Sequence, residues 1–224
     1  MCFSAEASFS ASAVILTIGA ISLKKSTTTP QRVLSCIPII FGSQQFSEGI
    51  EWLALTHPGM APWDKVFSYV FLIFAAVIWP TVVPLAIWLL EKHPVVKKIS
   101  GVLLVFGVIV SSLLAYTLIV FKVESFVSCS HIVYNIEYPD PLKHKGIFYF
   151  TAAVGPFLIS TTKRVRLLGT TIFVSYLISQ FFYKDYLISV WCFFAAIISV
   201  MVLSIIIKLN QTAPVSVVGK NEAA

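Results

Sequence analysis

The chain of 224 residues is strongly apolar, because 58% of its residues are hydrophobic and only 12% are charged, against about a quarter charged residues in a typical soluble domain. Its mean hydropathy is +0.89. A soluble globule could not cover this much apolar surface, so the composition excludes a soluble domain. The formal net charge of +6 does not indicate a nucleic-acid partner, because the basic residues lie in the connections between apolar stretches.

The apolar residues are grouped into stretches of membrane-spanning length. A spanning helix needs about 20 mostly apolar residues, because the hydrocarbon core of a bilayer is about 30 Å thick. The sequence contains seven such stretches, which predict an all-α integral membrane protein built as a seven-transmembrane-helix bundle. In chain order they are Ser4–Leu23, Val33–Leu55, Phe67–Leu90, Ile99–Phe121, Ile147–Ser160, Leu167–Phe182 and Tyr186–Leu209.

The basic residues are unevenly distributed among the connections. They follow the first, third and fifth stretches and end the chain: Lys24, Lys25, Arg32, Lys92, Lys97, Lys98, Lys163, Arg164, Arg166, Lys208 and Lys220. Because cytoplasmic connections carry an excess of Lys and Arg, we expect the N-terminus outside and the C-terminus in the cytoplasm. We therefore expect one membrane domain over residues 1–209, with an outer loop at 122–145, and a disordered cytoplasmic tail at 210–224.

The outer loop contains an alternating segment. From His131 to Tyr138, polar side chains alternate with β-branched and aromatic ones. A period of two residues with this composition predicts an extended strand or a hairpin, which would lie over the outer end of the bundle.

The second stretch carries the strongest indication of a functional site. At about 100° per residue, its side chains Gln44, Glu48 and Glu51 lie within an arc of about 60° on a helix. A carboxylate that faces lipid at the bilayer centre costs roughly 2.5 kcal/mol or more, so this face is expected to line a polar site near the outer surface. In a competing interpretation, Glu51 lies among lipid headgroups beside Trp52 as an interfacial anchor, and Glu48 bonds a neighbouring helix.

The predicted topology also gathers potential metal ligands on the outer side. Thiolate, imidazole and carboxylate groups are the ligands of zinc and copper sites, and Cys2, His57, His131 and Glu48 supply them. No Cys-x-x-Cys or His-Glu-x-x-His spacing supports a metal. For Glu6 and His57 we prefer structural roles, in the first turn of a helix and in a turn respectively.

Two motifs carry a family resemblance. The opening Met-Cys-Phe-Ser-Ala-Glu-Ala-Ser-Phe and the later Phe-Gly-Ser-Gln-Gln-Phe-Ser-Glu-Gly-Ile-Glu-Trp resemble an uncharacterised family of bacterial multi-pass membrane proteins, a domain of unknown function that begins in this way. The resemblance implies a protein of the bacterial inner (plasma) membrane and brings no activity with it. It also implies that Cys2, Glu6, Gln45, Glu48 and Trp52 are the residues to test first.

These observations favour a polar carboxylate pocket near the outer face, used in transport or sensing of a proton, cation or small solute. The expected pocket residues are Gln44, Gln45, Glu48, Glu51, Trp52 and Glu6. One alternative is a membrane-embedded metal-dependent hydrolase that uses the same pocket with a glutamate as general base. Another is a non-catalytic membrane subunit or assembly factor. The predicted partners are the lipid bilayer and a small solute or ion.

Overall fold

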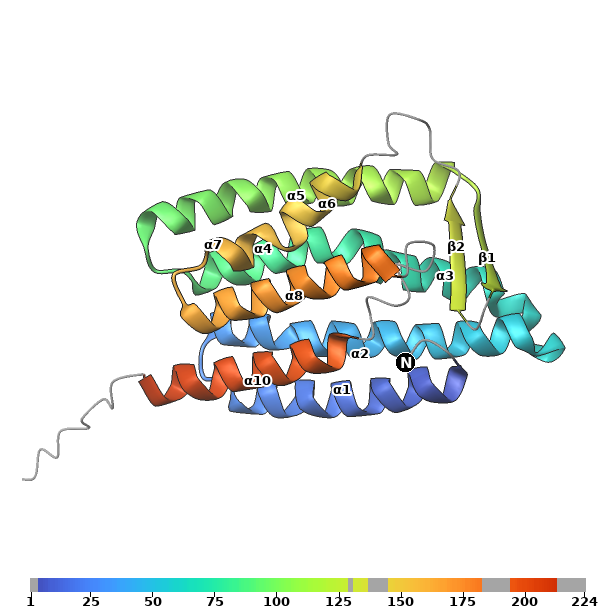
Figure 1. The fold of residues 1–224 in the computed structure, drawn as a ribbon, viewed down its shortest axis with the longest axis horizontal. Helices are drawn as coiled ribbons and strands as arrows, with labels where there is room; N and C mark the ends of the chain where they lie inside the picture. The colour runs from blue at the N-terminus through green and yellow to red at the C-terminus, as the bar shows by residue number, and fades with distance from the viewer. Residues whose placement is uncertain (1–3, 129–130, 137–144, 183–193, 213–224) are drawn as a thin grey trace, which may run out of the picture.

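The structure is a computed structural model that describes residues 4–128, 131–136, 145–182 and 194–212. Its helices run along one long axis, and a two-stranded hairpin crosses one end (Figure 1). Among the described residues, four helical segments are long and apolar enough to cross a membrane: Ala5–Lys25, Pro58–Leu90, Pro94–Val120 and Lys163–Phe182. These helices support the predicted helical membrane class.

The first two helices, α1 (Ala5–Lys25) and α2 (Thr29–Thr56), pack along each other. Ser4 is the N-cap of α1, and Thr28 forms a capping box with Gln31 at the start of α2. Each cap satisfies backbone N–H groups that have no partner within the helix. The turn between the helices is therefore short and well defined.

Glycines on α2 allow α1 to approach closely. A Cβ atom at Gly42 would lie 2.6 Å from the Leu16 side chain, and one at Gly49 would lie 2.7 Å from the Phe9 ring. The hydroxyl of Ser12 donates to the Gly42 carbonyl oxygen at 2.8 Å. Larger residues at these glycines would push the helices apart, so the α1–α2 contact depends on their small size.

A long helical segment follows, made of η1 (Pro58–Trp63), α3 (Asp64–Leu72), η2 (Ile73–Ile78) and α4 (Trp79–Leu90). The η2 turn is a π-helix and lies immediately before the prolines of α4. Proline has no N–H group and its ring crowds the carbonyl of the residue four positions earlier, so it disturbs the hydrogen-bond ladder of the preceding turn. The π-helical turn is the local response to that disturbance.

Neighbouring helices satisfy carbonyl groups around this turn. The Ser111 hydroxyl donates to the Val77 carbonyl oxygen at 2.6 Å, and the Tyr149 hydroxyl donates to that of Ala75 at 2.6 Å. Gly107 lies so close to α4 that a Cβ atom there would be 1.8 Å from the Pro80 carbonyl oxygen. A helix that is broken inside a membrane is tolerated only where such contacts exist.

Helix α5 (Pro94–Val120) leads into the strands β1 (Val123–Ser128) and β2 (His131–Ile136). The strands are antiparallel, and their register pairs Val123 with Ile136 and Ser128 with His131. The hairpin predicted from the alternating segment is therefore confirmed. Its side chains Val123 and Ile136 pack with Phe71 and Leu72 of α3.

The second half of the chain forms α6 (Lys145–Ala153), α7 (Gly155–Ile159), α8 (Lys163–Phe182) and α10 (Ala195–Thr212). The break between α6 and α7 falls just before Pro156, which stands in the first turn of α7. The main core joins α2, α4, α7, α8 and α10, and its fully buried members include Leu34, Ile87, Phe157, Leu168 and Ile205.

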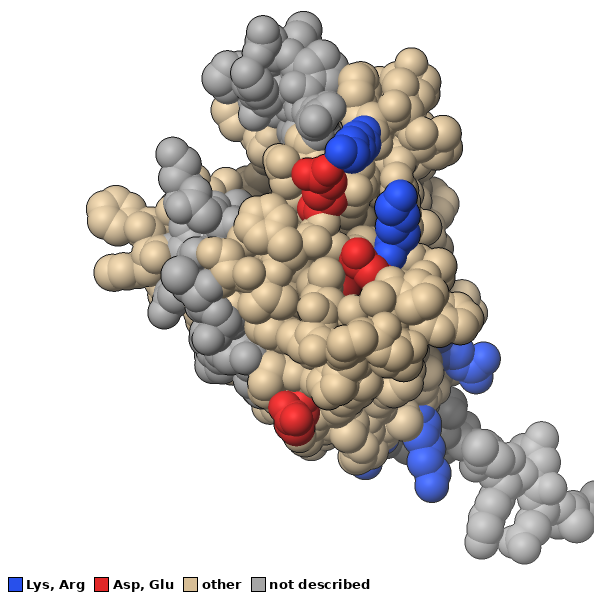
Figure 2. Space-filling model, turned by 90° about the vertical axis from the view of Figure 1, so that its right-hand side faces the viewer, with Lys and Arg blue, Asp and Glu red and all other residues tan. Residues whose placement is uncertain are grey.

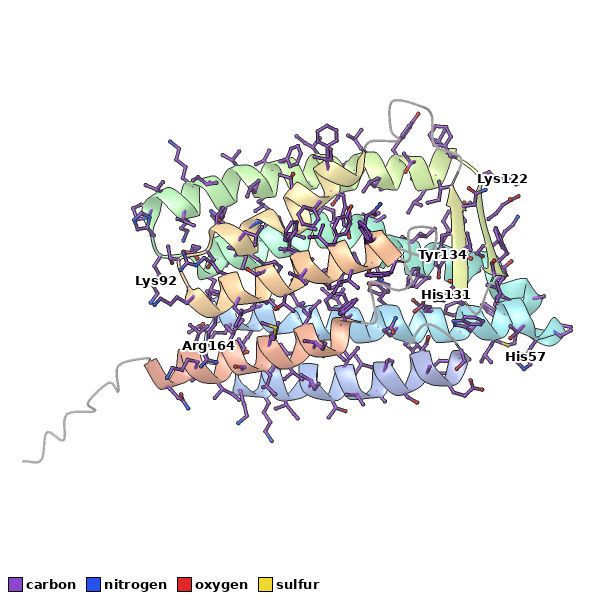
Figure 3. The ribbon with its side chains drawn as sticks, in the orientation of Figure 1. His57, Lys92, Lys122, His131, Tyr134 and Arg164 are labelled. Atoms are coloured by element: carbon purple, nitrogen blue, oxygen red, sulfur yellow. The ribbon has the colours of Figure 1, made fainter. Side chains whose placement is uncertain are left out.

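The two ends of the bundle differ in charge. The basic end carries the connections with Lys24, Lys25, Lys92, Lys163 and Arg164, and Figure 3 places Lys92 and Arg164 there. The opposite end, which we call the hairpin end, carries His57 and Lys122 (Figure 3). Both acidic and basic side chains reach the surface at the hairpin end (Figure 2).

Helix α10 extends further than the sequence indicated. The predicted tail starts at residue 210, but the helix continues to Thr212, and residues 213–224 lie outside the described residues. Asn210 holds this end in place: its Oδ1 accepts from Gln31 Nε2 at 3.0 Å, and its Nδ2 donates to the Lys25 carbonyl oxygen at 2.6 Å. The contact joins α10 to the α1–α2 turn.

We expect Asn210→Ala to lower the free energy of unfolding by about 1–2 kcal/mol, because it removes hydrogen bonds at a half-buried position. Thermal unfolding of detergent-purified protein measures the change. The matched control is Gln211→Ala, which truncates an exposed neighbour and should leave the midpoint unchanged. Equal midpoints for Asn210→Ala and the wild type would contradict the assigned role.

Candidate functional site

The polar residues of α2 are buried together inside the bundle. Glu48 and Glu51 are 0% exposed, and Gln44 and Gln45 are each 1% exposed. Ser47 is also buried, and its hydroxyl donates to the carbonyl oxygen of Gln44, so this hydrogen bond lies within α2. The two carboxyl groups lie on successive turns of one helix, at a spacing that brings side chains together.

Both oxygens of the Glu51 carboxyl group are hydrogen-bonded. The Ser68 hydroxyl of α3 donates to Oε1 at 2.7 Å, and the Tyr134 hydroxyl of β2 donates to Oε2 at 2.7 Å. Tyr134 is held in place by stacking on Phe71, with 4.7 Å between ring centroids and 10° between planes. Glu51 therefore joins α2 to α3 and to the hairpin, and it is buried within the protein.

A series of short contacts continues from Glu51 toward the surface. Ser68 Oγ lies 2.6 Å from Ser125 Oγ of β1, and Ser125 Oγ lies 2.9 Å from Asp64 Oδ1 at the start of α3. Glu51 and Ser68 are buried, whereas Ser125 and Asp64 are half-buried. The series thus leads from the interior to the hairpin end.

Glu48 has a partner on its own helix. Gln45 Nε2 donates to Glu48 Oε2 at 2.7 Å, while Gln44 Oε1 accepts from Trp79 Nε1 at 3.0 Å. Within the described part of the chain, Gln45 Oε1 and Trp52 Nε1 are buried polar atoms with no hydrogen-bond partner. Helix α2, which carries the two carboxyl groups, therefore also has one buried hydrogen-bond acceptor, Gln45 Oε1, and one buried donor, Trp52 Nε1, without a partner among the described residues.

Two of the sequence-predicted residues lie apart from the buried face. Glu6 is exposed in the first turn of α1, the structural position that the sequence analysis preferred for it. His57 is the exposed C-cap of α2, and its Nδ1 lies 2.9 Å from Thr56 Oγ1. At about 1.5 Å per residue, its Cα is roughly 13.5 Å along the helix axis from that of Glu48.

His131 is 7% exposed and pairs with Ser128 across the hairpin. Figure 3 shows it, with Tyr134, at the hairpin end. Cys2 and Cys129 lie outside the described residues. Among the residues that are described, no group of three or more His, Cys, Asp or Glu side chains could hold a metal ion. The zinc or copper alternative therefore gains no set of ligands from the structure.

Sequence reasoning missed the partners of Glu51. Ser68 is a single hydroxyl in an apolar stretch, Asp64 precedes that stretch, and Ser125 precedes the alternating segment. Tyr134 belongs to that segment but was assigned no role. The available signal was the strand alternation, which places Tyr134 with Ile132 and Ile136 on the side of β2 that is packed against the bundle.

A second buried carboxyl group at the basic end was also missed. Glu91 follows α4 and is 2% exposed. It accepts from the Ser160 hydroxyl, from the Thr161 backbone N–H at 2.9 Å and from the Thr161 hydroxyl at 2.7 Å. Because donors on the α7–α8 connection satisfy both of its oxygens, Glu91 joins α4 to that connection and serves a structural role.

Fold and site together define a helical protein with several apolar helices of membrane-spanning length and a buried, hydrogen-bonded carboxyl network. The chain belongs to a family described as "Family of unknown function (DUF6629)", whose model matches residues 1–216. This finding confirms the resemblance to an uncharacterised family and supplies no activity. No curated protein and no solved structure matches the chain.

We expect Tyr134→Phe to lower the free energy of unfolding by about 1–3 kcal/mol, because it removes a hydrogen bond to a fully buried carboxyl group. Thermal unfolding in detergent measures the effect. Tyr116→Phe is the matched control, since Tyr116 on α5 is 58% exposed. If the two substitutions had the same effect, the Tyr134 hydroxyl would not be supporting Glu51.

Proposed function

We propose that this chain is a seven-span protein of the bacterial inner membrane that takes up a proton or small cation from the outer face at Glu48 and Glu51 and transports it. The N-terminus lies outside and the C-terminus in the cytoplasm. Transport is preferred to sensing because the buried carboxyl groups lie inside a bundle of membrane-length helices, connected to one end of it.

The distribution of charge supports this orientation. The connections at the basic end carry Lys24, Lys25, Lys92, Lys163 and Arg164, and an excess of Lys and Arg is typical of cytoplasmic connections. At the hairpin end, the exposed Glu124 pairs with Lys122 at 2.5 Å. The hydrogen bond and positive charge of Lys122 lower the pKa of Glu124. The hairpin end thus has a mixed charge, which suits the outer side.

The observation that carries the proposal is the complete burial of Glu48 and Glu51 on successive turns of α2. Removing a carboxylate from water costs several kcal/mol unless other groups compensate, and two carboxylates this close also repel each other. A bound proton or cation relieves both costs. Carboxyl groups in such positions mark ion pathways and proton relays in membrane proteins.

Flux measurements test the proposal. We expect Glu48→Gln and Glu51→Gln each to reduce proton or cation flux by about tenfold or more, which corresponds to the loss of about 1.4 kcal/mol of stabilisation. The protein is reconstituted in liposomes that contain a pH-sensitive dye, and gradients of protons, sodium or potassium are imposed in turn. Glu124→Gln is the matched control, because it neutralises an exposed carboxylate at the same end.

Several outcomes would contradict the transport assignment. Wild-type flux in the double variant Glu48→Gln, Glu51→Gln would show that these residues do not carry the ion. Elemental analysis of the wild type, Glu48→Ala and Cys2→Ser distinguishes transport from the hydrolase alternative. Zinc or copper that is stoichiometric in the wild type and absent from both variants would favour the hydrolase. A protein with neither flux nor metal would fit a non-catalytic subunit.

A further inference from the structure

Four oxygen atoms from three elements form an unbroken series at the hairpin end. They are Glu51 Oε1 on α2, Ser68 Oγ on α3, Ser125 Oγ on β1 and Asp64 Oδ1 on α3. The three successive distances are 2.7, 2.6 and 2.9 Å. Each distance is that of a hydrogen bond between oxygen atoms, so each contact requires a hydrogen atom between its two oxygens.

The two serines cannot supply enough hydrogen atoms. A serine hydroxyl has one hydrogen, and an ionised carboxylate has none. If both carboxyl groups were ionised, Ser68 would donate to Glu51 and Ser125 would donate to Asp64. The contact of 2.6 Å between the two hydroxyl oxygens would then have no hydrogen. Ser68 Oγ also lies 2.9 Å from the Asp64 carbonyl oxygen and 3.3 Å from Asp64 Oδ1, and these further acceptors increase the shortage.

We propose that Asp64, Ser125, Ser68 and Glu51 form a proton relay that holds one proton in common between the two carboxyl groups and passes it from the hairpin end to the buried site. This inference rests on the proposed function and names its substrate as the proton. It also names the path of entry, through the half-buried Asp64 and Ser125.

The transfer balances without a co-reactant. In the outer state Asp64 is a carboxylic acid and donates to Ser125, Ser125 donates to Ser68, and Ser68 donates to the Glu51 carboxylate. Each O–H bond then breaks as its hydrogen moves to the next oxygen. The result is an ionised Asp64 and a protonated Glu51, with the same net charge. Rotation of the two hydroxyl groups resets the series for the next proton.

The distances favour a proton over a metal cation along this path. Hydroxyl and carboxylate oxygens bind Mg²⁺ at about 2.0–2.1 Å and Ca²⁺ at 2.3–2.6 Å. On the straight line between two oxygens that are 2.6 to 2.9 Å apart, a cation would lie far closer to each oxygen than these values, so a cation could bind only beside the path. A proton fits directly between such oxygens and can pass along them without moving α2, α3 or β1.

Other titratable groups surround the relay. Glu48 lies one turn from Glu51 on α2, and Tyr134 of β2 donates to the second oxygen of Glu51. His131 is buried on β2, and on β1 Glu124 is paired with Lys122. Tyr134 fixes the position of the Glu51 carboxyl group, and Glu48 lies next to the inner end of the relay, where it can receive the proton.

The test interrupts the relay at one hydroxyl group and restores it with another. We expect Ser125→Ala to reduce proton flux in liposomes by about a hundredfold, which is the lower end of the rate effects of positioned proton-transfer groups. Ser125→Thr keeps the hydroxyl group and should restore most of the flux. Ser199→Ala is the matched control, because it removes a fully buried hydroxyl group on α10.

Infrared spectroscopy gives a second measurement that does not depend on transport. Near neutral pH, the wild type should show a protonated carboxyl band that the double variant Glu51→Gln, Asp64→Asn lacks. In Ser125→Ala the band should differ in frequency from that of the wild type, because the two carboxyl groups no longer share a proton. If Ser125→Ala fails to fold, the pair Ser68→Ala and Ser68→Thr provides the same comparison.

The outcomes separate the relay from the transport function. Flux and band in Ser125→Ala that equal those of the wild type would overturn the relay. Flux that is lost in Glu51→Gln but kept in Ser125→Ala would overturn it as well, and would leave the transport function in place. A shared carboxyl proton in a wild type without flux would support the relay and overturn transport.

Discussion

The structure depends on how the two carboxyl groups of α2 are buried. Water solvates a carboxylate so well that a protein interior must replace it with hydrogen bonds or opposite charge. For Glu51 the replacement comes from Ser68 and Tyr134, which belong to a different helix and to the hairpin. The carboxyl group of Glu51 therefore links α3 and β2 to the end of α2.

The same requirement governs the backbone. The prolines of α4 disturb the hydrogen-bond ladder near η2, and hydroxyl groups from other helices occupy the carbonyls of Val77 and Ala75. At the basic end, the α7–α8 connection satisfies Glu91 in a comparable way. Glu91 is satisfied by donors alone, whereas the oxygens beyond Glu51 lack a hydrogen atom. This difference is the basis for proposing proton transfer at Glu51 and a structural role for Glu91.

Much of the site face could be predicted because its pattern is local. Gln44, Glu48 and Glu51 lie on one helix, so the helical period alone places them on one face. The alternation around Tyr134 likewise predicts a strand without any knowledge of its partner. The end of the last helix was less predictable, because Asn210 near that end contacts the α1–α2 turn, which is far away in the sequence.

The sequence by itself determined the helical membrane class, the hairpin and the polar face of α2, since composition and periodicity act over one or two turns of chain. Only the tertiary structure decided that Ser68 and Tyr134, which are 17 and 83 residues from Glu51 in the sequence, donate to its carboxyl group. It likewise brought Ser125 to Ser68, from which it is separated by 57 residues. It also decided that Glu6 and His57 lie apart from the buried face. Such encounters arise from the packing of whole elements, and no local period encodes which distant hydroxyl group will reach a buried carboxyl group.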